Sequence, residues 1–217
     1  MLVRPKNRAH PSSPPVPHHP DPLVLRGYDG ALLRLEPWRW HGPATGQERE
    51  LLAGLLGPVL DVGCGPGRMV EALAHQGVVA LGVDPAPGAA LLARRRGCPV
   101  LQRSVFEPLP GEGRWGSVLL LDGNLGIGGD PLSLLRRCRG LVRSGGCLVA
   151  EVEPPGTQGR TCRARLERGC QSSAWFAWSV VSADSIDGLA ARAGFGMRTL
   201  AGGRDGRWFA HLTPRHA

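Results

Sequence analysis

An apolar segment that runs directly into a glycine-dense turn constrains this chain more than any other feature. Residues 59–62 read Val-Leu-Asp-Val, and Gly63, Gly65 and Gly67 follow at alternating positions. Glycine adopts positive φ angles without steric cost and lets the main chain approach a ligand closely. A turn of this kind at the carboxyl end of a parallel strand is typical of nucleotide-binding α/β folds. The segment therefore predicts a buried strand followed by a turn that holds a cofactor.

Two well-known phosphate-binding turns match these residues less well. A dinucleotide-binding G-x-G-x-x-G fingerprint needs glycine where this chain has Arg68. A phosphate-binding loop ends in Gly-Lys-Ser/Thr, and no lysine follows the turn. A tight strand-to-helix turn without a ligand is the remaining alternative. Asp61 and three glycines in register after an apolar strand favour the cofactor turn.

The composition indicates an ordinary globular protein. Its 217 residues are enough for one α/β domain with a substantial core. Hydrophobic residues make up 42% of the chain, and no apolar run reaches the ~18 residues that a membrane span needs. The charged first residues are not followed by an apolar segment, as a secretory signal would require. We therefore expect a cytoplasmic location and no membrane partner.

The cysteines and the charges argue against several kinds of site. Six cysteines are scattered without C-x-x-C spacing, so neither a metal site nor a disulfide framework is predicted. The net charge is +8, of which residues 1–22 contribute +2 (three cations, one anion) and residues 160–217 contribute +5 (nine cations, four anions). Residues 23–159 contribute only +1 (fourteen cations, thirteen anions). Because the central part of the chain is almost neutral, nucleic acid is not the expected partner.

Proline separates a leader from the folded part of the chain. Seven prolines within residues 1–22 predict a disordered leader. Residues 23–36 predict a hairpin around Asp29-Gly30, and residues 23–44 are taken as an N-terminal hairpin or lid. One domain is expected over residues 23–213, followed by a tail of residues 214–217.

Strands and helices alternate through the middle of the chain. Thr45 and Glu48 match a capping box that opens a helix. Further helices are expected to begin near Arg68, Pro87 and Pro131, and residues 143–146 are expected to form a turn. Apolar strands are expected at residues 59–62, 78–83, 100–105, 117–121 and 147–152, a half-solvated strand at 162–167, and two last strands around 202–206. This order predicts an α/β fold with a Rossmann-like, doubly wound, seven-stranded and mostly parallel sheet that ends in a C-terminal antiparallel hairpin strand.

Asp61 and the three glycines resemble motif I of the class I S-adenosylmethionine (SAM)-dependent methyltransferases. Asp84 closes the second strand, and Asp122-Gly123-Asn124 at the end of the fourth strand resembles motif IV. The resemblance covers most of residues 45–213 and implies that SAM is the cofactor. It implies a cofactor site made of Asp61, Gly63, Cys64, Gly65, Gly67, Asp84, Pro85, Ser104, Val105, Asp122, Gly123 and Asn124.

The resemblance also implies roles for some of these residues. In that family the glycine turn lies under the amino acid and sugar of SAM, and the motif I acid, here Asp61, helps to orient the cofactor. Asp84 would accept hydrogen bonds from the ribose hydroxyls, and Pro85 would pack on the sugar or the adenine. The family often has an acid at the end of the third strand that reaches the adenine amino group. This chain has Ser104 there, so the adenine contact stays open.

The sequence of motif IV narrows the choice of acceptor. DNA enzymes that methylate amino groups carry an Asn/Asp-Pro-Pro-aromatic signature there, which residues 122–125 lack. Cytosine C5 methylation needs a Cys after a Pro in the same region, and none is present. The predicted function is therefore methyl transfer from SAM to a small molecule. A non-catalytic SAM-binding regulatory module and an RNA methyltransferase stay open as alternatives.

The reaction itself asks little of the protein's acid–base groups. Because the methyl group of a sulfonium is already activated, proximity and orientation can supply most of the acceleration, on the order of 7–11 kcal/mol. No catalytic residue is assigned, and the candidates for an optional base are His41, Asp122, Glu151, Glu153 and His211. Tyr28, Trp38, Trp40 and residues 175–178 are expected to wall an apolar acceptor pocket or to pack in the core.

Overall fold

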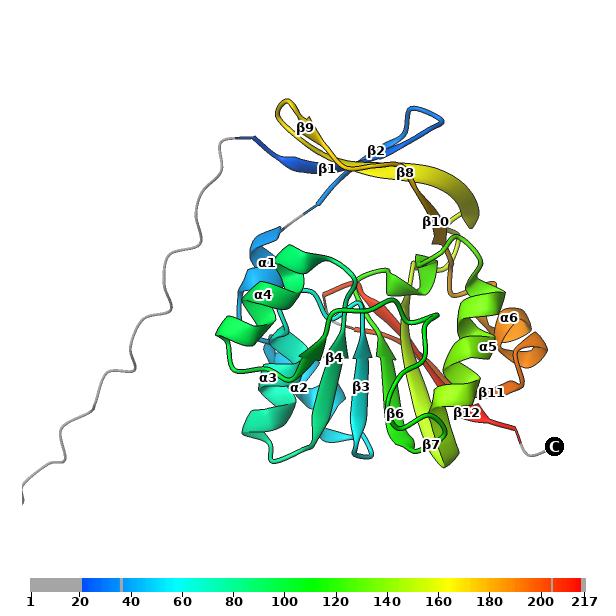
Figure 1. Cartoon of the computed structure of the whole chain (residues 1–217). Helices are drawn as coiled ribbons and strands as arrows, with labels where there is room; N and C mark the ends of the chain where they lie inside the picture. The colour runs from blue at the N-terminus through cyan, green and yellow to red at the C-terminus, as the bar shows by residue number, and fades with distance from the viewer. Residues whose placement is uncertain (1–20, 36, 204, 216–217) are drawn as a thin grey trace, which may run out of the picture.

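The computed structural model describes residues 21–35, 37–203 and 205–215 and contains two β-sheets (Figure 1). All of the expected leader except its last two residues lies outside this range, as do residues 216–217 of the expected tail. Within the described residues, no helix combines the length and the apolar character that crossing a membrane requires.

The larger sheet has seven strands in the order β11-β12-β7-β6-β3-β4-β5. Neighbours from β7 to β5 run parallel, whereas β12 is antiparallel to both β7 and β11. This confirms the predicted Rossmann-like fold class. The strands are β3 (Val59–Val62), β4 (Ala80–Val83), β5 (Val100–Leu101), β6 (Trp115–Leu120), β7 (Val142–Val152), β11 (Phe195–Gly202) and β12 (Trp208–Pro214).

Helices cover both faces of this sheet. α2 (Gly46–Ala53), α3 (Arg68–His75) and α4 (Pro87–Arg95) lie on one face, and α5 (Pro131–Leu141) and α6 (Ile186–Arg192) lie on the other (Figure 1). On α5, the side chains of Leu134, Leu135 and Leu141 are fully buried against the strands. Each such burial contributes about 1.5–3 kcal/mol. Burial on both faces is the usual state of a parallel sheet.

Two helices begin with the caps that the sequence predicts. At the start of α2 the Glu48 amide donates to the Thr45 hydroxyl (3.2 Å), and the Thr45 amide donates to the Glu48 carboxylate (2.8 Å). At the start of α5 the Ser133 amide donates to the Asp130 carboxylate (3.1 Å), and Pro131 occupies the first turn. These contacts satisfy amides that the start of a helix otherwise leaves unpaired.

The second sheet is antiparallel and combines two distant parts of the chain. The predicted hairpin around Asp29-Gly30 forms β1 (Leu23–Gly27) and β2 (Leu32–Arg34). β1 then pairs with β8 (Arg160–Arg168), which in turn pairs with β10 (Phe176–Val180) and β9 (Gln171–Ser172). We call these five strands the lid sheet, because they lie over the carboxyl ends of the parallel strands (Figure 1). The sequence predicted the hairpin and the half-solvated strand, but not their pairing.

Two local predictions were wrong. Residues 143–146 are not a turn between helix and strand but part of the long strand β7. The register between β6 and β7 shifts between Trp115 and Ser117, and this irregularity accommodates the extra residues. The third strand was expected to reach residue 105 and ends at Leu101. It is an edge strand that pairs with β4 through only two residues, and the chain then leaves the sheet.

Candidate active site

The glycine turn after β3 has the backbone geometry that its sequence predicts. Gly63, Gly65 and Gly67 have positive φ angles of 71°, 53° and 86°, and Gly67 caps α3. A Cβ atom on Gly63 would lie 2.5 Å from Nδ2 of Asn124, so no larger residue fits there. At Gly65 a Cβ atom would meet nothing within 4 Å. The main chain at Gly65 is therefore open to a ligand.

Asp84 lies beside this turn at the end of β4. Its Oδ2 accepts from the Gly65 amide (3.0 Å), and its Oδ1 accepts from the Ala86 amide (2.8 Å). Burial raises the pKa of the Asp84 carboxyl, and the hydrogen bonds from the two amides oppose that rise. An ionised carboxylate offers about four acceptor positions, so two remain for hydroxyl groups of a ligand.

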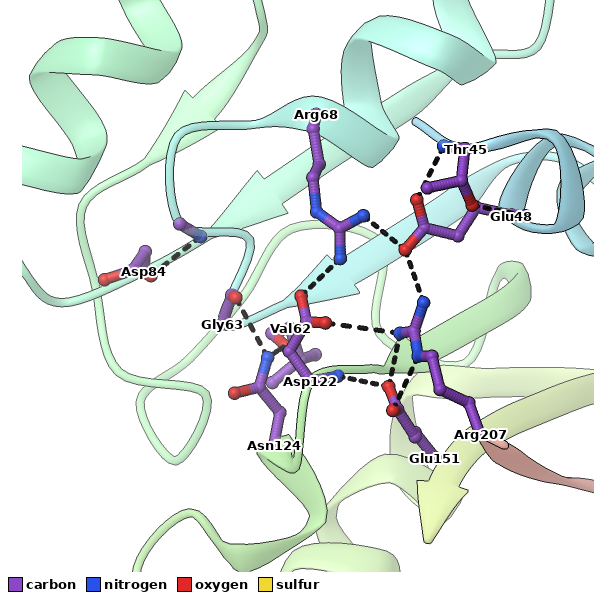
Figure 2. A network of polar contacts seen from close by, with 11 residues as sticks. Thr45, Glu48, Val62, Gly63, Arg68, Asp84, Asp122, Asn124, Glu151 and Arg207 are labelled. Carbon is purple, nitrogen blue, oxygen red and sulfur yellow. Dashed lines mark hydrogen bonds and ion pairs between the residues drawn. The ribbon is translucent and has the colours of Figure 1, made fainter. Parts of the chain in front are cut away.

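Motif IV is joined directly to the glycine turn (Figure 2). Nδ2 of Asn124 donates to the carbonyl oxygens of Val62 and Gly63, each at 2.9 Å. Asp122 and Gly123 both have a left-handed backbone conformation, with φ angles of 54° and 79°. Asp122 is the single non-glycine residue with positive φ in the described parts of the chain, and such strain is common at functional sites. The structure thus brings the predicted residues of motifs I and IV together with Asp84.

The remaining predicted site residues differ in their exposure and in the groups that they could present to a cofactor. Pro85 is exposed next to Asp84. The Ser104 hydroxyl accepts from the Phe106 amide (3.3 Å), and Val105 is buried in the core. Cys64 packs its thiol among Val70, Ala93 and Cys98 in a small apolar cluster. Any contact between Cys64 and a cofactor would therefore be made by its main chain.

Five charged residues form a network at the ends of the strands, which we call the charge network (Figure 2). Glu48, Arg68 and Arg207 are buried, Glu151 is half-buried, and Asp122 is exposed. Arg68 pairs with Glu48 and with Asp122 (2.6 Å to the latter). Arg207 pairs with Glu48 and Glu151 (each 2.5 Å) and with Asp122 (3.2 Å). In addition, the Asp122 amide donates to Glu151 (2.6 Å). The network therefore joins α2, α3, β7 and the chain before β12.

Pairing keeps Glu48, Arg68 and Arg207 charged although all three are buried. Burial alone would raise the pKa of the Glu48 carboxyl, but hydrogen bonds from Arg68, the Thr45 amide and Arg207 lower it to about 2. The same carboxylates raise the pKa of both guanidinium groups above the ordinary value, against the effect of burial. Asp122 and Glu151 are consequently held in ion pairs, which makes them poor candidates for a base.

Asp61 contrasts with the charge network because, within the described residues, it forms no hydrogen bond or ion pair and feels Arg68 only through its charge. Its side chain is only 3% exposed, and no hydrogen bond or ion pair reaches its carboxylate from the described residues. Burial, and after it the negative charge of Asp122, raise the pKa of the Asp61 carboxyl to about 7. A buried carboxylate without a partner is costly, and a bound cation would relieve that cost.

A cavity of about 360 Å³ lies between the lid sheet and the strand ends. Asp122, Gly123, Glu151 and Glu153 line it from the strand ends. Its other walls are mainly apolar and include Leu25, Leu35, Trp40, Ala164, Trp178 and Val181. We call this space the lid cavity. It adjoins motif IV and therefore the glycine turn.

Only some of the predicted pocket residues line the lid cavity. Of the aromatic residues, Trp40 of α1 (Pro37–His41) and Trp178 of β10 do so. Tyr28 is 77% exposed and Trp38 is 59% exposed. Trp175 packs edge-to-face against Tyr28 with ring centroids 5.5 Å apart.

Of the five predicted base candidates, two histidines lie away from the lid cavity. His211 pairs with Val149 in the middle of the sheet rather than at a strand end. His41 is not among the residues that line the lid cavity in the described structure, and its carbonyl accepts from Arg96. Burial lowers the pKa of both imidazoles, and nearby arginines lower it further. The remaining candidate, Glu153, lines the cavity and makes no ion pair within the described residues.

Arg68, Arg207 and the second role of Glu48 were not predicted from the sequence. The sequence indicated only that Arg68 stands where a dinucleotide fingerprint has glycine, and that Glu48 belongs to a capping box. One clue was available in the sequence. The expected C-terminal hairpin strand begins directly after Arg207, and in the structure this strand, β12, pairs with β7, so that Arg207 lies beside Glu151 near the carboxyl edge of the sheet.

Comparisons with known proteins agree with this geometry. Residues 59–146 match a family model described as a methyltransferase domain. The ubiquinone biosynthesis O-methyltransferase of Methylocella silvestris is 32% identical over 139 residues, which are 62% of this chain and 48% of that protein. A SAM-dependent methyltransferase from Bacteroides fragilis, solved with S-adenosyl-L-homocysteine, has a TM-score of 0.75 at 21% identity, over 90% of this chain and 89% of that chain. The sugar N-methyltransferase KedS8 from Streptoalloteichus sp. ATCC 53650 has a TM-score of 0.59 at 18% identity, over 100% of this chain and 99% of that chain.

The matched segment includes the parts that form the candidate site. Residues 59–146 contain the glycine turn, Asp84 and motif IV, and the solved structures share the fold. The chain spans less than half the length of the curated relatives that it matches. Residues 59–146 therefore match a methyltransferase domain, and the chain has the fold of the solved SAM-dependent methyltransferases.

Proposed function

We propose that the protein transfers the methyl group of SAM to a small molecule held in the lid cavity. The observation that carries the proposal is that the lid cavity adjoins Asp122 and Gly123, and that Asn124 joins these residues to the glycine turn. One site would thus hold the methyl donor next to a separate, mainly apolar space for an acceptor.

The residues around the glycine turn fit SAM. The open main chain at Gly65 and the two unused acceptor positions of Asp84 suit the ribose. The unpartnered carboxylate of Asp61 suits the ammonium group of the methionine part, because a cation relieves its buried charge. When bound, SAM would supply a methyl carbon that its positively charged sulfur has already activated. The predicted cofactor contacts of Gly63, Cys64, Gly67, Pro85, Ser104, Val105 and Asn124 stay part of this proposal.

The part played by the protein is then mainly to position the reactants and to exclude water. The lid sheet covers the strand ends, and the charge network fixes Asp122 from three directions through Arg68, Arg207 and Glu151. A rigid wall next to the acceptor limits the orientations in which it can bind. Orientation of this kind accounts for on the order of 7–11 kcal/mol in favourable reactions.

A small acceptor is favoured over a macromolecule. The lid cavity, at about 360 Å³, is within the usual size range of small-molecule sites. By their names, the related proteins act in ubiquinone biosynthesis and on a sugar, which supports the same class of acceptor. The cytoplasmic location and the single domain over residues 23–213 stay predictions that accompany this proposal.

Isothermal titration calorimetry with SAM and with S-adenosylhomocysteine tests the proposal at its first step. We expect both to bind, and Asp84→Ala to weaken binding by roughly tenfold or more, since it removes hydrogen bonds to a charged acceptor. Asp187→Ala, an exposed acid on α6, is the matched control and should leave binding unchanged. Absence of binding to the wild-type protein would falsify the proposal.

The second step separates the proposal from its two alternatives. Transfer of a labelled methyl group from SAM to compounds of a small-molecule extract supports it. Binding of SAM without transfer to any acceptor favours the regulatory module. Labelling of RNA, with binding that weakens steeply as salt is raised, favours the RNA methyltransferase.

A further inference from the structure

We infer that the acceptor is an amine with an apolar body, held in the lid cavity by the carboxylate of Glu153 and the indole of Trp178. The inference rests on the proposed function and adds the chemical class of the acceptor and the residues that select it.

Among the described residues, Glu153 is the one carboxylate at the strand-end wall of the lid cavity that is not held in an ion pair or hydrogen bond. Three acids line this wall, and two of them, Asp122 and Glu151, are held by Arg68 and Arg207. Within the described residues, the Glu153 side chain makes no hydrogen bond or ion pair. Its negative charge is therefore available to a ligand.

The backbone of Glu153 is nevertheless fixed. Its amide donates to the Val181 carbonyl (2.9 Å), and its carbonyl accepts from the Ala183 amide (2.8 Å). It follows β7 directly and forms a bridge with Ser182. Side chains alternate along an extended chain, so Glu153 is on the same side as Glu151. A free carboxylate on a fixed backbone can orient a ligand rather than only attract it.

The charges around this wall favour a cation. The charge network holds three carboxylates and two guanidinium groups, which gives a net charge of −1. Glu153 adds a further negative charge, and no arginine among the described residues forms an ion pair with it. The basic residues that line the lid cavity come instead from the lid sheet and α1, namely Arg34, Arg39 and Arg160. The amine would therefore lie at the strand ends, and neutral or acidic substituents of the acceptor would lie toward the lid.

Trp178 supplies the second element of amine recognition. It pairs with Ile127 across from the motif IV loop, and its indole lies against Gly126, where a Cβ atom would be 2.9 Å from the ring. Trp178 also lies near Gly123, with 3.7 Å between the ring and the position of a Cβ atom there. The ring is thus beside the place where donor and acceptor would meet. An aromatic face attracts ammonium groups, and Leu25, Ala164 and Val181 offer apolar contact to the rest of the molecule.

Glu153 also has a use in the reaction itself. An amine binds as the ammonium ion and has to lose one proton before its nitrogen can react. The Glu153 carboxylate takes that proton and passes it to water, which frees the nitrogen lone pair. The lone pair forms the new bond to the methyl carbon, and the bond between that carbon and sulfur breaks with its electron pair left on sulfur. The products are the neutral thioether and the methylated ammonium ion, which now carries the positive charge that sulfur has lost.

Pairs of compounds that differ only in the reacting group test this inference. In the presence of S-adenosylhomocysteine, we would titrate the full chain with 2-phenylethylamine and 2-phenylethanol, and with tryptamine and tryptophol, by calorimetry. We expect each amine to bind roughly tenfold or more tightly than its alcohol, because a hydrogen bond to a charged group is stronger than one between neutral groups. Labelled SAM should methylate the amine of each pair in preference.

Three variants identify the residues responsible. Glu153→Gln should remove the preference for the amine while leaving S-adenosylhomocysteine binding and thermal stability unchanged. Glu153→Asp should restore part of the preference. Glu50→Gln, an exposed acid on α2 away from the lid cavity, is the matched control and should keep the full preference.

The outcomes separate this inference from the proposed function. If S-adenosylhomocysteine binds but the alcohols bind as well as the amines, or if neither kind of probe binds, the inference is wrong and the proposed function stands. Retention of the amine preference by Glu153→Gln also overturns it. If S-adenosylhomocysteine does not bind the wild-type protein, the proposed function itself fails.

Discussion

The two sides of the candidate site are built in different ways. On the cofactor side, the side chains of Asp84 and Asn124 are joined by hydrogen bonds to the main chain of the glycine turn, and the charge network lies directly beside them (Figure 2). On the acceptor side, the lid sheet contributes mainly apolar side chains around a space of about 360 Å³. Polar contacts fix geometry, whereas apolar walls accept a range of shapes. The first side is therefore suited to one unchanging ligand, and the second to an acceptor that can differ among related proteins.

The largest effect on cofactor binding is expected at the glycine turn. Gly63→Ala would place a Cβ atom 2.5 Å from the Asn124 amide at a φ of 71°, and would push motif IV away from motif I. We expect S-adenosylhomocysteine binding to fall by roughly a hundredfold or more, since strain of about 1–3 kcal/mol adds to the lost hydrogen bonds. Calorimetry measures the affinity.

Gly88→Ala is the matched control for that substitution. Gly88 lies in α4, and a Cβ atom there would meet nothing within 4 Å. Because alanine favours a helix over glycine by about 0.8–1 kcal/mol, this variant should be as stable as the wild type or more so. A Gly63→Ala variant that binds as well as Gly88→Ala would contradict the close packing of motifs I and IV.

The largest effect on stability is expected in the charge network. Arg207→Met keeps much of the side-chain volume but leaves Glu151 without its arginine and Glu48 and Asp122 with Arg68 alone. Removing one partner from a buried ion pair typically costs about 3–5 kcal/mol of stability. Urea unfolding should show a loss of that size. Arg94→Met, at an exposed position on α4, should show almost none.

How much of this arrangement the sequence predicts depends on the distance along the chain between interacting residues. The capping box of Thr45 and Glu48, the strand of residues 59–62 and the turn at Gly63 are local patterns, and the structure confirms each. The alternation of elements predicted the parallel sheet, because short right-handed connections leave few other topologies.

The lid sheet and the charge network could not be predicted in this way. Leu25 pairs with Leu166 across most of the chain, and alternating side chains indicate a strand without indicating its partner. The charge network draws its five residues from separate elements, and their contacts exist only once the helices have packed on the sheet. Whether the twelve predicted cofactor residues contact SAM stays a prediction.

A smaller and more selective effect is expected on the acceptor side. Trp178→Leu removes the indole beside Gly126 but keeps an apolar residue in the wall of the lid cavity. We expect whichever amine probe binds the wild type to bind roughly tenfold more weakly, within the range of cation–π interactions. S-adenosylhomocysteine should bind as before. Trp38→Leu, at a position that is 59% exposed, serves as the control. An equal loss of affinity for the amine probe and for S-adenosylhomocysteine would mean that the cofactor side and the acceptor side of the site are not independent.

The smallest expected effect concerns pH and distinguishes Asp61 from the paired acids around it. The pKa of Asp61 is raised to about 7 in the folded protein. Between pH of about 4 and 7, the folded protein without a ligand therefore still holds a proton on Asp61, whereas the unfolded chain has released it. This group therefore makes the free protein less stable as pH rises through that range.

A bound ammonium group would favour the ionised form of Asp61 and reverse this cost. The affinity for SAM should then rise roughly tenfold from pH 6 to pH 8 and release a proton, which calorimetry in buffers of different ionisation enthalpy detects. Asp61→Asn should bind SAM with little dependence on pH over the same range. Since Glu48 has its pKa lowered to about 2, it stays ionised throughout and contributes nothing to this profile. A wild-type affinity that does not change between pH 6 and 8 would show that Asp61 is not the group that receives the ammonium of the cofactor.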